Sequence, residues 1–263
     1  MLTSLYRKAQ YLSLDIVLGA VILLRFFSNQ LQVEISVFIY LLLAGSVWLI
    51  YTIDHLRDAR HAKNSKRGRY QFHDKNEKWL KVAIAIIILL CTYGVFQIEL
   101  DLLISGSLII VLSGIYLLIH QHLSKRGLKE CYVALIYTIG ILIAPFTALK
   151  SIEWDVAWLL FLLTLSNLIL FSWFEQSEDE ADEFNSIATI MDSSTMNRII
   201  LVLLSLGLAS TILMEFNTIT IYFLIAFVIY ASLFINKNWS GQHFRYRTIG
   251  DGVFLFPILL TLI

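Results

Sequence analysis

Carboxylates stand at two places in this sequence with a spacing that suits metal binding. The first segment reads Tyr51-Thr-Ile-Asp54-His-Leu-Arg-Asp58, and the second reads Glu175-Gln-Ser-Glu178-Asp-Glu-Ala-Asp182. Each contains two acids four residues apart, and residues at i and i+4 share one face of a helix. The sequence therefore predicts two carboxylate pairs, Asp54 with Asp58 and Glu178 with Asp182.

The second segment is unusually dense in negative charge. Six acids and no basic residue fall within nine positions: Glu175, Glu178, Asp179, Glu180, Asp182 and Glu183. Such a segment is either a solvated acidic loop or a site for a hard cation. Mg²⁺ binds carboxylate oxygens and often completes its shell with substrate phosphates. Together the two segments favour a Mg²⁺ site around a diphosphate, with these predicted ligands: Asp54, Asp58, Glu175, Glu178 and Asp182.

Compact pairs of basic residues accompany the acids. Arg67 and Arg69 follow the first acid pair, and Lys125 and Arg126 form a second pair further along. Arg and Lys side chains grip phosphate oxygens well, although basic residues beside a membrane can also serve only to fix its topology. We take these four residues as candidates for binding the diphosphate.

The composition limits which elements can position these groups. Of the 263 residues, 58% are apolar and 15% are charged, whereas a soluble domain is about half apolar and a quarter charged. This excludes a disordered chain, a disulfide-rich secreted scaffold and an ordinary soluble enzyme. The sequence predicts an all-α polytopic membrane protein, and residues 1–263 contain no linker that would divide them into domains.

A helix that crosses a bilayer needs about 20 mostly apolar residues. The sequence contains nine candidate spans, of which the first and the last are short or carry a charge. They cover residues 11–27, 34–53, 79–98, 100–120, 130–149, 154–174, 198–215, 217–235 and 247–263.

Basic residues orient these spans. Nine spans leave only Arg25 and Lys150 on one side of the membrane and the remaining 18 of the 20 Lys and Arg on the other. The positive side of a membrane protein is cytoplasmic. We therefore expect a protein of the cytoplasmic membrane with the N-terminus inside and the C-terminus outside. Both acid segments then lie on the cytoplasmic side, in loops 54–78 and 175–197.

The helix count and the two acid segments after the second and sixth spans resemble the UbiA-type membrane prenyltransferase superfamily. The first family motif reads N-D-x2-D-x3-D, and here Ile50 and Tyr51 stand where it has Asn and Asp, ahead of Asp54 and Asp58. The second motif is similar to the segment from Glu178 through Asp182 and Ser186 to Thr189. Tyr116 ahead of Lys125 and Arg126 also resembles a family feature.

This resemblance implies a ring of helices around a central cavity. It implies Mg²⁺ as the cofactor, and a prenyl diphosphate and the lipid bilayer as partners, with no nucleic acid. The reaction would transfer the prenyl group to an aromatic or lipid-like acceptor. Because Tyr51 replaces a carboxylate, we expect either weaker metal binding at the first motif or help from another acid. Asp15 and Asp251 are candidates, because acids within membrane segments usually face a cavity or a partner.

Other classes of protein remain open. A non-catalytic relative that keeps the fold but has lost turnover would explain the missing Asn and Asp. A transporter would place acids and helix breaks near the middle of the membrane, whereas the acids here fall at span ends. A phosphatidyl-group transferase would need a D-G-x2-A-R core, of which only Asp58-Ala-Arg60 is present. The sequence does not select an acceptor, a prenyl length or an oligomeric state.

Overall fold

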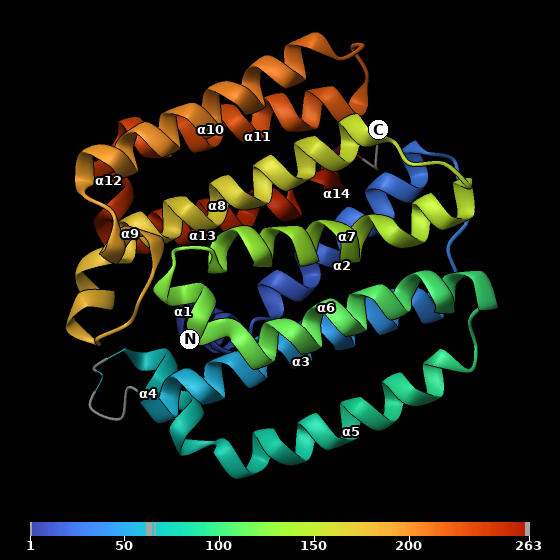
Figure 1. The fold of residues 1–263 in the computed structure, drawn as a ribbon, viewed down its shortest axis with the longest axis horizontal. Helices are drawn as coiled ribbons and strands as arrows, with labels where there is room; N and C mark the ends of the chain where they lie inside the picture. The colour runs from blue at the N-terminus through green and yellow to red at the C-terminus, as the bar shows by residue number, and fades with distance from the viewer. Residues whose placement is uncertain (1, 62–64, 66, 261–263) are drawn as a thin grey trace.

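The computed structural model describes residues 2–61, 65 and 67–260, which form helices and no strand. The long helices run side by side in one bundle (Figure 1). In chain order the helices are α1 Leu2–Tyr11, α2 Leu14–Gln30, α3 Val37–His61, α4 Gly68–Lys75, α5 Glu77–Val95, α6 Leu100–Lys125, α7 Lys129–Leu149, α8 Trp154–Ala181, α9 Ile187–Ile190, α10 Ser193–Leu213, α11 Thr218–Ile235, α12 Lys237–Gly241, the 3₁₀ turn Gln242–Phe244, α13 Arg245–Leu255 and α14 Pro257–Leu260.

Seven of the described helices are long and apolar enough to cross a membrane: α3, α5, α6, α7, α8, α10 and α11. The predicted class, an all-α polytopic membrane protein, is confirmed. The first predicted span corresponds to α2, which has 17 residues. The last predicted span is not one continuous helix, because α13 ends at Leu255 and Pro257 begins α14. Proline lacks the backbone N–H that would continue the helix through this point.

Two helices extend beyond the predicted ends of their spans. Helix α3 continues to His61 and α8 continues to Ala181, so the acids at the start of each predicted loop lie on helical turns instead. Both helix ends lie with the short helices α4 and α9 at one end of the bundle, at the left of Figure 1. We call this end of the molecule the polar end.

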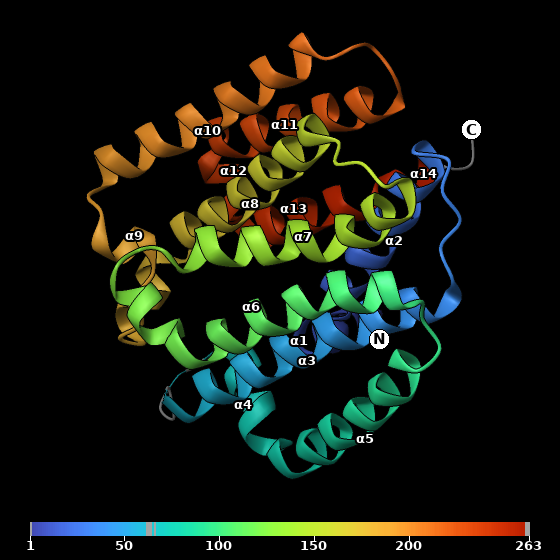
Figure 2. The same cartoon turned by 45° about the vertical axis from the view of Figure 1, so that its right-hand side comes forward.

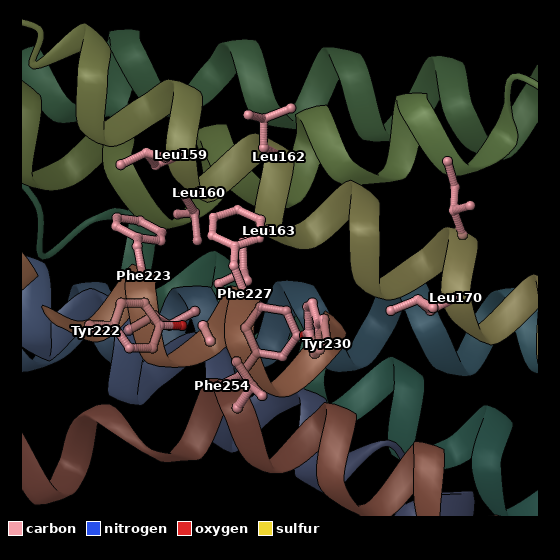
Figure 3. Packing of buried hydrophobic residues seen from close by; sticks show 14 of the residues in the cluster. Leu159, Leu160, Leu162, Leu163, Leu170, Tyr222, Phe223, Phe227, Tyr230 and Phe254 are labelled. Atoms are coloured by element: carbon pink, nitrogen blue, oxygen red, sulfur yellow. The ribbon is translucent and has the colours of Figure 1, made fainter. Parts of the chain in front are cut away.

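Helix α8 lies at the centre of the bundle. In its apolar stretch 67% of the residues are buried, against 6% in α6, whose leucines and isoleucines are largely exposed, as suits contact with lipid. Leu159, Leu160 and Leu163 of α8 pack over Phe223 and Phe227 of α11 (Figure 3). Figure 2 shows α5 at the edge of the bundle furthest from α10, where α5 packs on α3.

Two glycines bring α13 close to its neighbours. A Cβ atom on Gly19 of α2 would lie 2.9 Å from Cβ of Phe254, and one on Gly250 of α13 would lie 2.7 Å from the ring of Phe171. Contacts this short leave room for hydrogen only. Helix α13 is thereby held against both α2 and α8, which fixes the positions of the acids on α2 and α13.

Candidate functional site

A cavity of about 920 Å³ opens at the polar end and gathers most of the predicted site residues. Asp54 and Asp58 reach it from α3, and Glu175 and Asp179 reach it from α8. Lys129 at the start of α7 completes the charged lining. The two acid segments, which are far apart in the sequence, therefore share one cavity.

On the α3 side, Asp54 is buried and already has partners. Its Oδ1 atom accepts a hydrogen bond from the Tyr116 hydroxyl at 3.2 Å, and its Oδ2 atom lies 3.3 Å from Lys129 Nζ. Asp58, one turn later, has no salt bridge within the described part of the chain. The predicted pair therefore consists of one neutralised carboxylate and one without a cation.

The residues on α3 fit a metal ion. Ligand atoms of Asp54, His55 and Asp58 all lie within 4.8 Å of one another. The buried His55 Nδ1 has no hydrogen-bond partner, and a buried polar atom of this kind is costly unless something binds it. Carboxylate oxygens are the ligands that Mg²⁺ prefers.

On the α8 side, the structure brings a different pair of acids to the cavity from the pair that the motif suggested. Glu175 and Asp179, also four residues apart, line the cavity, whereas Glu178 and Asp182 do not. Glu178 and Asp182 instead lie 3.2 Å and 3.0 Å from Arg67 Nε. Asp182 also accepts a hydrogen bond from Ser65 Oγ at 2.9 Å.

Arg67 links the segment before α4 to the end of α8. Its Nη2 atom donates to Asp179 Oδ1 at 2.8 Å, so one guanidinium serves three acids. Burial opposes the charge of Arg67, but the Tyr70 hydroxyl and the Asp179 carboxylate together raise its pKa above the usual value. Arg67 therefore stays charged and holds the acids of α8 together against their mutual repulsion.

Glu175 is also paired. Its Oε1 atom accepts hydrogen bonds from Arg247 Nε at 3.2 Å and from the Tyr246 hydroxyl at 3.1 Å. Both partners come from α13, which connects the end of the chain to the site. No sequence pattern predicts this contact, because neither partner lies near either of the two acid segments.

The predicted basic residues separate into two groups. Arg67, Arg69 and Lys125 line the cavity, and Arg69 forms no salt bridge among the described residues. Arg126 is exposed and lies outside the lining. Lys129, which in the sequence is only one of the basic residues that orient the spans, contacts Asp54 directly.

A second, apolar cavity of about 490 Å³ adjoins the first. It lies between α3, α5, α6 and α7, and shares with the polar cavity the residues Ile50, Tyr51, Tyr116 and Val133. Ile88 of α5 and Ile110 of α6 line it and are themselves exposed, so it opens toward the lipid side of the bundle. The charged polar cavity thus continues into the apolar cavity.

Asp15 and Asp251 lie apart from the polar cavity. Both line a third cavity of about 180 Å³, which we call the inner chamber. Tyr51, His55 and Arg69 line the polar cavity as well as the inner chamber, and therefore form the boundary between them. Of the three α3 residues that could hold a metal, His55 lines the inner chamber with the two acids, whereas Asp54 and Asp58 line the polar cavity alone.

Comparison with protein-family models and with curated proteins finds no match to this sequence. Comparison with solved structures does find one. A UbiA homolog from Archaeoglobus fulgidus, bound to GPP and Mg²⁺, aligns over 97% of this chain and 99% of its own, with a TM-score of 0.65. The chain has a UbiA-like fold. Sequence identity is 9%, so this likeness establishes the fold and leaves activity to the site residues.

Proposed function

We propose that this protein is a Mg²⁺-dependent integral-membrane prenyltransferase, which transfers a prenyl group from a prenyl diphosphate to an aromatic or lipid-like acceptor. The observation that carries the proposal is the junction of the charged cavity with the apolar one at Tyr51 and Tyr116. A molecule with a diphosphate head and a hydrocarbon tail fits this pair of spaces. The UbiA-like fold and the GPP and Mg²⁺ of the structural neighbour support the same substrate.

Carboxylates from both helices would hold the metal. Asp54 and Asp58 offer oxygens from α3, and Glu175 and Asp179 offer oxygens from α8. Glu178 and Asp182, the ligands suggested by the motif, contact Arg67 and would contribute to the site by positioning it. Bound Mg²⁺ would neutralise charge on the diphosphate as the leaving group departs.

Basic side chains and the apolar walls would serve the other needs of the reaction. Lys129, Arg69 and Lys125 line the cavity and can donate hydrogen bonds to phosphate oxygens. The rings of Tyr51 and Tyr116, at the junction, can shield the allylic carbon as it becomes positive. The apolar cavity would keep water from capturing that carbon.

The proposal includes an orientation in the cytoplasmic membrane. The distribution of Lys and Arg supports an N-terminus and a polar end on the cytoplasmic side and a C-terminus outside. A water-soluble diphosphate head would then reach the polar end from the cytoplasm, while the prenyl tail would enter from the bilayer.

One observation favours a second candidate, a relative that binds the lipid diphosphate without turnover. Lys129 already neutralises Asp54, Arg67 neutralises Asp179, and Tyr51 stands where the family motif has an acid. A site with this many internal partners holds metal less tightly. Substrate binding without any release of diphosphate, over a broad set of acceptors, would favour this candidate.

The test is the binding of geranyl thiodiphosphate, which resists cleavage, to the purified protein by calorimetry. We expect saturable binding in the presence of Mg²⁺ that is lost when a chelator is added. In Asp58→Asn the affinity should fall at least ~tenfold, which corresponds to about 1.4 kcal/mol of binding free energy. Arg126→Gln, which changes an exposed residue outside the cavity, is the matched control. Absence of binding by folded wild-type protein would refute the proposal.

A further inference from the structure

Three cavities meet at one side chain. Tyr51 lines the apolar cavity, the polar cavity and the inner chamber. Tyr137 separates the apolar cavity from the inner chamber, while His55 and Arg69 separate the polar cavity from it. If a prenyl diphosphate lies with its head in one space and its tail in the next, the carbon between them lies beside Tyr51. The inner chamber is the third space that borders this point.

The inner chamber is lined by polar groups of both signs: Arg247 shares the lining with Asp251 and with Asp15, whose Oδ1 atom accepts the backbone N–H of Ile16 at 3.0 Å. Asp15 from α2 and Asp251 from α13 face it, and neither forms a salt bridge within residues 7–61, 65 and 67–260. Thr164 of α8 is 4% exposed, and its Oγ1 atom has no hydrogen-bond partner. A buried hydroxyl without a partner costs free energy, so sites of this kind usually bind a ligand or water.

We propose that the inner chamber is the binding site for the acceptor, and that the acceptor is a compact hydroxyl-bearing molecule. This inference rests on the proposed function. A carboxylate of the chamber can accept the one hydrogen bond that a hydroxyl group donates, and the rings of Tyr51, Tyr137 and Phe254 provide apolar walls for the body of the molecule. A volume of about 180 Å³ admits a single small ring and excludes tetrapyrroles and long-chain lipids.

The chamber also provides for the chemistry of the acceptor. In the transfer, a lone pair on the acceptor oxygen forms the new bond to the prenyl carbon. The bond between that carbon and the diphosphate oxygen breaks, and its electron pair leaves with the diphosphate. The hydroxyl proton passes to the carboxylate of Asp15 or Asp251, so no other reactant is needed.

The position of the two acids depends on the packing of three helices. Gly19 holds α2 against Phe254 of α13, and Gly250 holds α13 against Phe171 of α8. Phe171 and Phe254 are also part of the chamber wall. The close approaches that fix the fold here therefore also fix the size of the chamber, which limits it to small acceptors.

The experiment measures binding of 4-fluorophenol to the purified protein by fluorine NMR. Specific binding is the fraction of bound 4-fluorophenol that excess phenol displaces. Probe that has partitioned into detergent is not displaced and is therefore not counted. We expect saturable binding that weakens at least tenfold in Asp15→Asn/Asp251→Asn and in Thr164→Leu, which fills the chamber. We expect no displaceable binding of 4-fluorotoluene, which has the same shape but lacks the hydroxyl. Thermal unfolding of each variant reports whether it is folded.

The outcomes separate this inference from the proposed function. Geranyl thiodiphosphate should bind both chamber variants within about twofold of wild type, because neither variant changes a residue that lines the polar cavity. If the thiodiphosphate fails to bind wild type, the proposed function fails, whatever the phenol result. If 4-fluorophenol fails to bind wild type, or binds both folded variants as tightly, the inner chamber is not the acceptor site.

Discussion

The ammonium group of Lys129 lies 3.3 Å from Oδ2 of Asp54, at the point where a metal ion would use the same oxygen. The two side chains are 26% and 12% exposed, so the pair is largely shielded from water. Lys129 supplies a fixed positive charge at the first acid pair. A diphosphate site built on these carboxylates would therefore carry part of its positive charge on Lys129 and would need less from metal ions.

Replacing Lys129 with methionine should have opposite effects on two ligands. The freed Asp54 carboxylate should bind Mg²⁺ alone roughly tenfold more tightly, because breaking a buried pair leaves a charge worth several kcal/mol without a partner. Geranyl thiodiphosphate should bind more weakly in saturating Mg²⁺, because a phosphate ligand is lost. Calorimetry with each ligand measures both effects. Lys78→Met, at an exposed lysine outside the cavity lining, is the control, and a parallel fall in both affinities would contradict this role.

Removing the guanidinium of Arg67 should destabilise the polar end. Asp179 and Asp182, with side chains 13% and 11% exposed, would lose their cation. Arg67→Gln should lower the free energy of unfolding by about 3 kcal/mol, as for other buried pairs broken on one side. Denaturant unfolding in detergent gives this value. Arg126→Gln, at an exposed arginine, should change it by less than ~0.5 kcal/mol, and equal effects of the two variants would refute the bridging role.

The close packing of α10 on α11 depends on Gly207. A Cβ atom there would overlap the ring of Phe227, which is fully buried. Gly207→Ala should cost about 1–3 kcal/mol of stability through overpacking. Gly114→Ala is the matched control, because a Cβ atom at Gly114 meets nothing within 4 Å. Thermal unfolding compares the two, and a Gly207 variant as stable as its control would show that the helices can separate.

Stability should depend on pH through His73. This residue of α4 is 1% exposed, and burial lowers its pKa below the usual 6.5. Above pH 6.5 His73 is neutral in both the folded and the unfolded protein. As the pH falls below 6.5 the unfolded chain binds the proton first, so the free energy of unfolding declines until the pH reaches the lower pKa of the folded state. His73→Phe should flatten the fall in thermal midpoint between about pH 7.5 and pH 5.5. His122→Phe, at an exposed histidine, should leave the slope unchanged, and an unchanged slope in both variants would exclude His73 as the source.

The sequence alone does not decide which two acids of the second segment reach the cavity. Six acids between 175 and 183 allow more than one i, i+4 pair, and periodicity alone treats Glu175 with Asp179 and Glu178 with Asp182 as equals. Arg67 Nε lies 3.2 Å and 3.0 Å from Glu178 and Asp182, the pair outside the cavity lining, and Arg67 Nη2 also contacts Asp179 within it. That contact joins segments 112 residues apart, and no local pattern predicts it.

The positions of the spans and the fold class are easier to predict from the sequence than the acid pair, because the length of an apolar segment decides whether it can cross a bilayer. The helix ends were less so. Helices α3 and α8 continue past their apolar stretches to His61 and Ala181, where polar residues contact one another at the polar end. The sequence makes Asp15 and Asp251 candidate cavity acids by their place in apolar segments, and the chamber that they line depends on how α2 and α13 pack.

The most direct test of the central claim places a metal and a diphosphate together in the polar cavity. Mn²⁺ can replace Mg²⁺, and pulsed electron paramagnetic resonance detects phosphorus nuclei bound next to Mn²⁺. With geranyl thiodiphosphate present, we predict a phosphorus coupling in the wild-type protein that disappears in Asp54→Asn/Asp58→Asn while the protein remains folded. A wild-type protein without this coupling, or a double variant that keeps it, would contradict a prenyl diphosphate site built on these carboxylates.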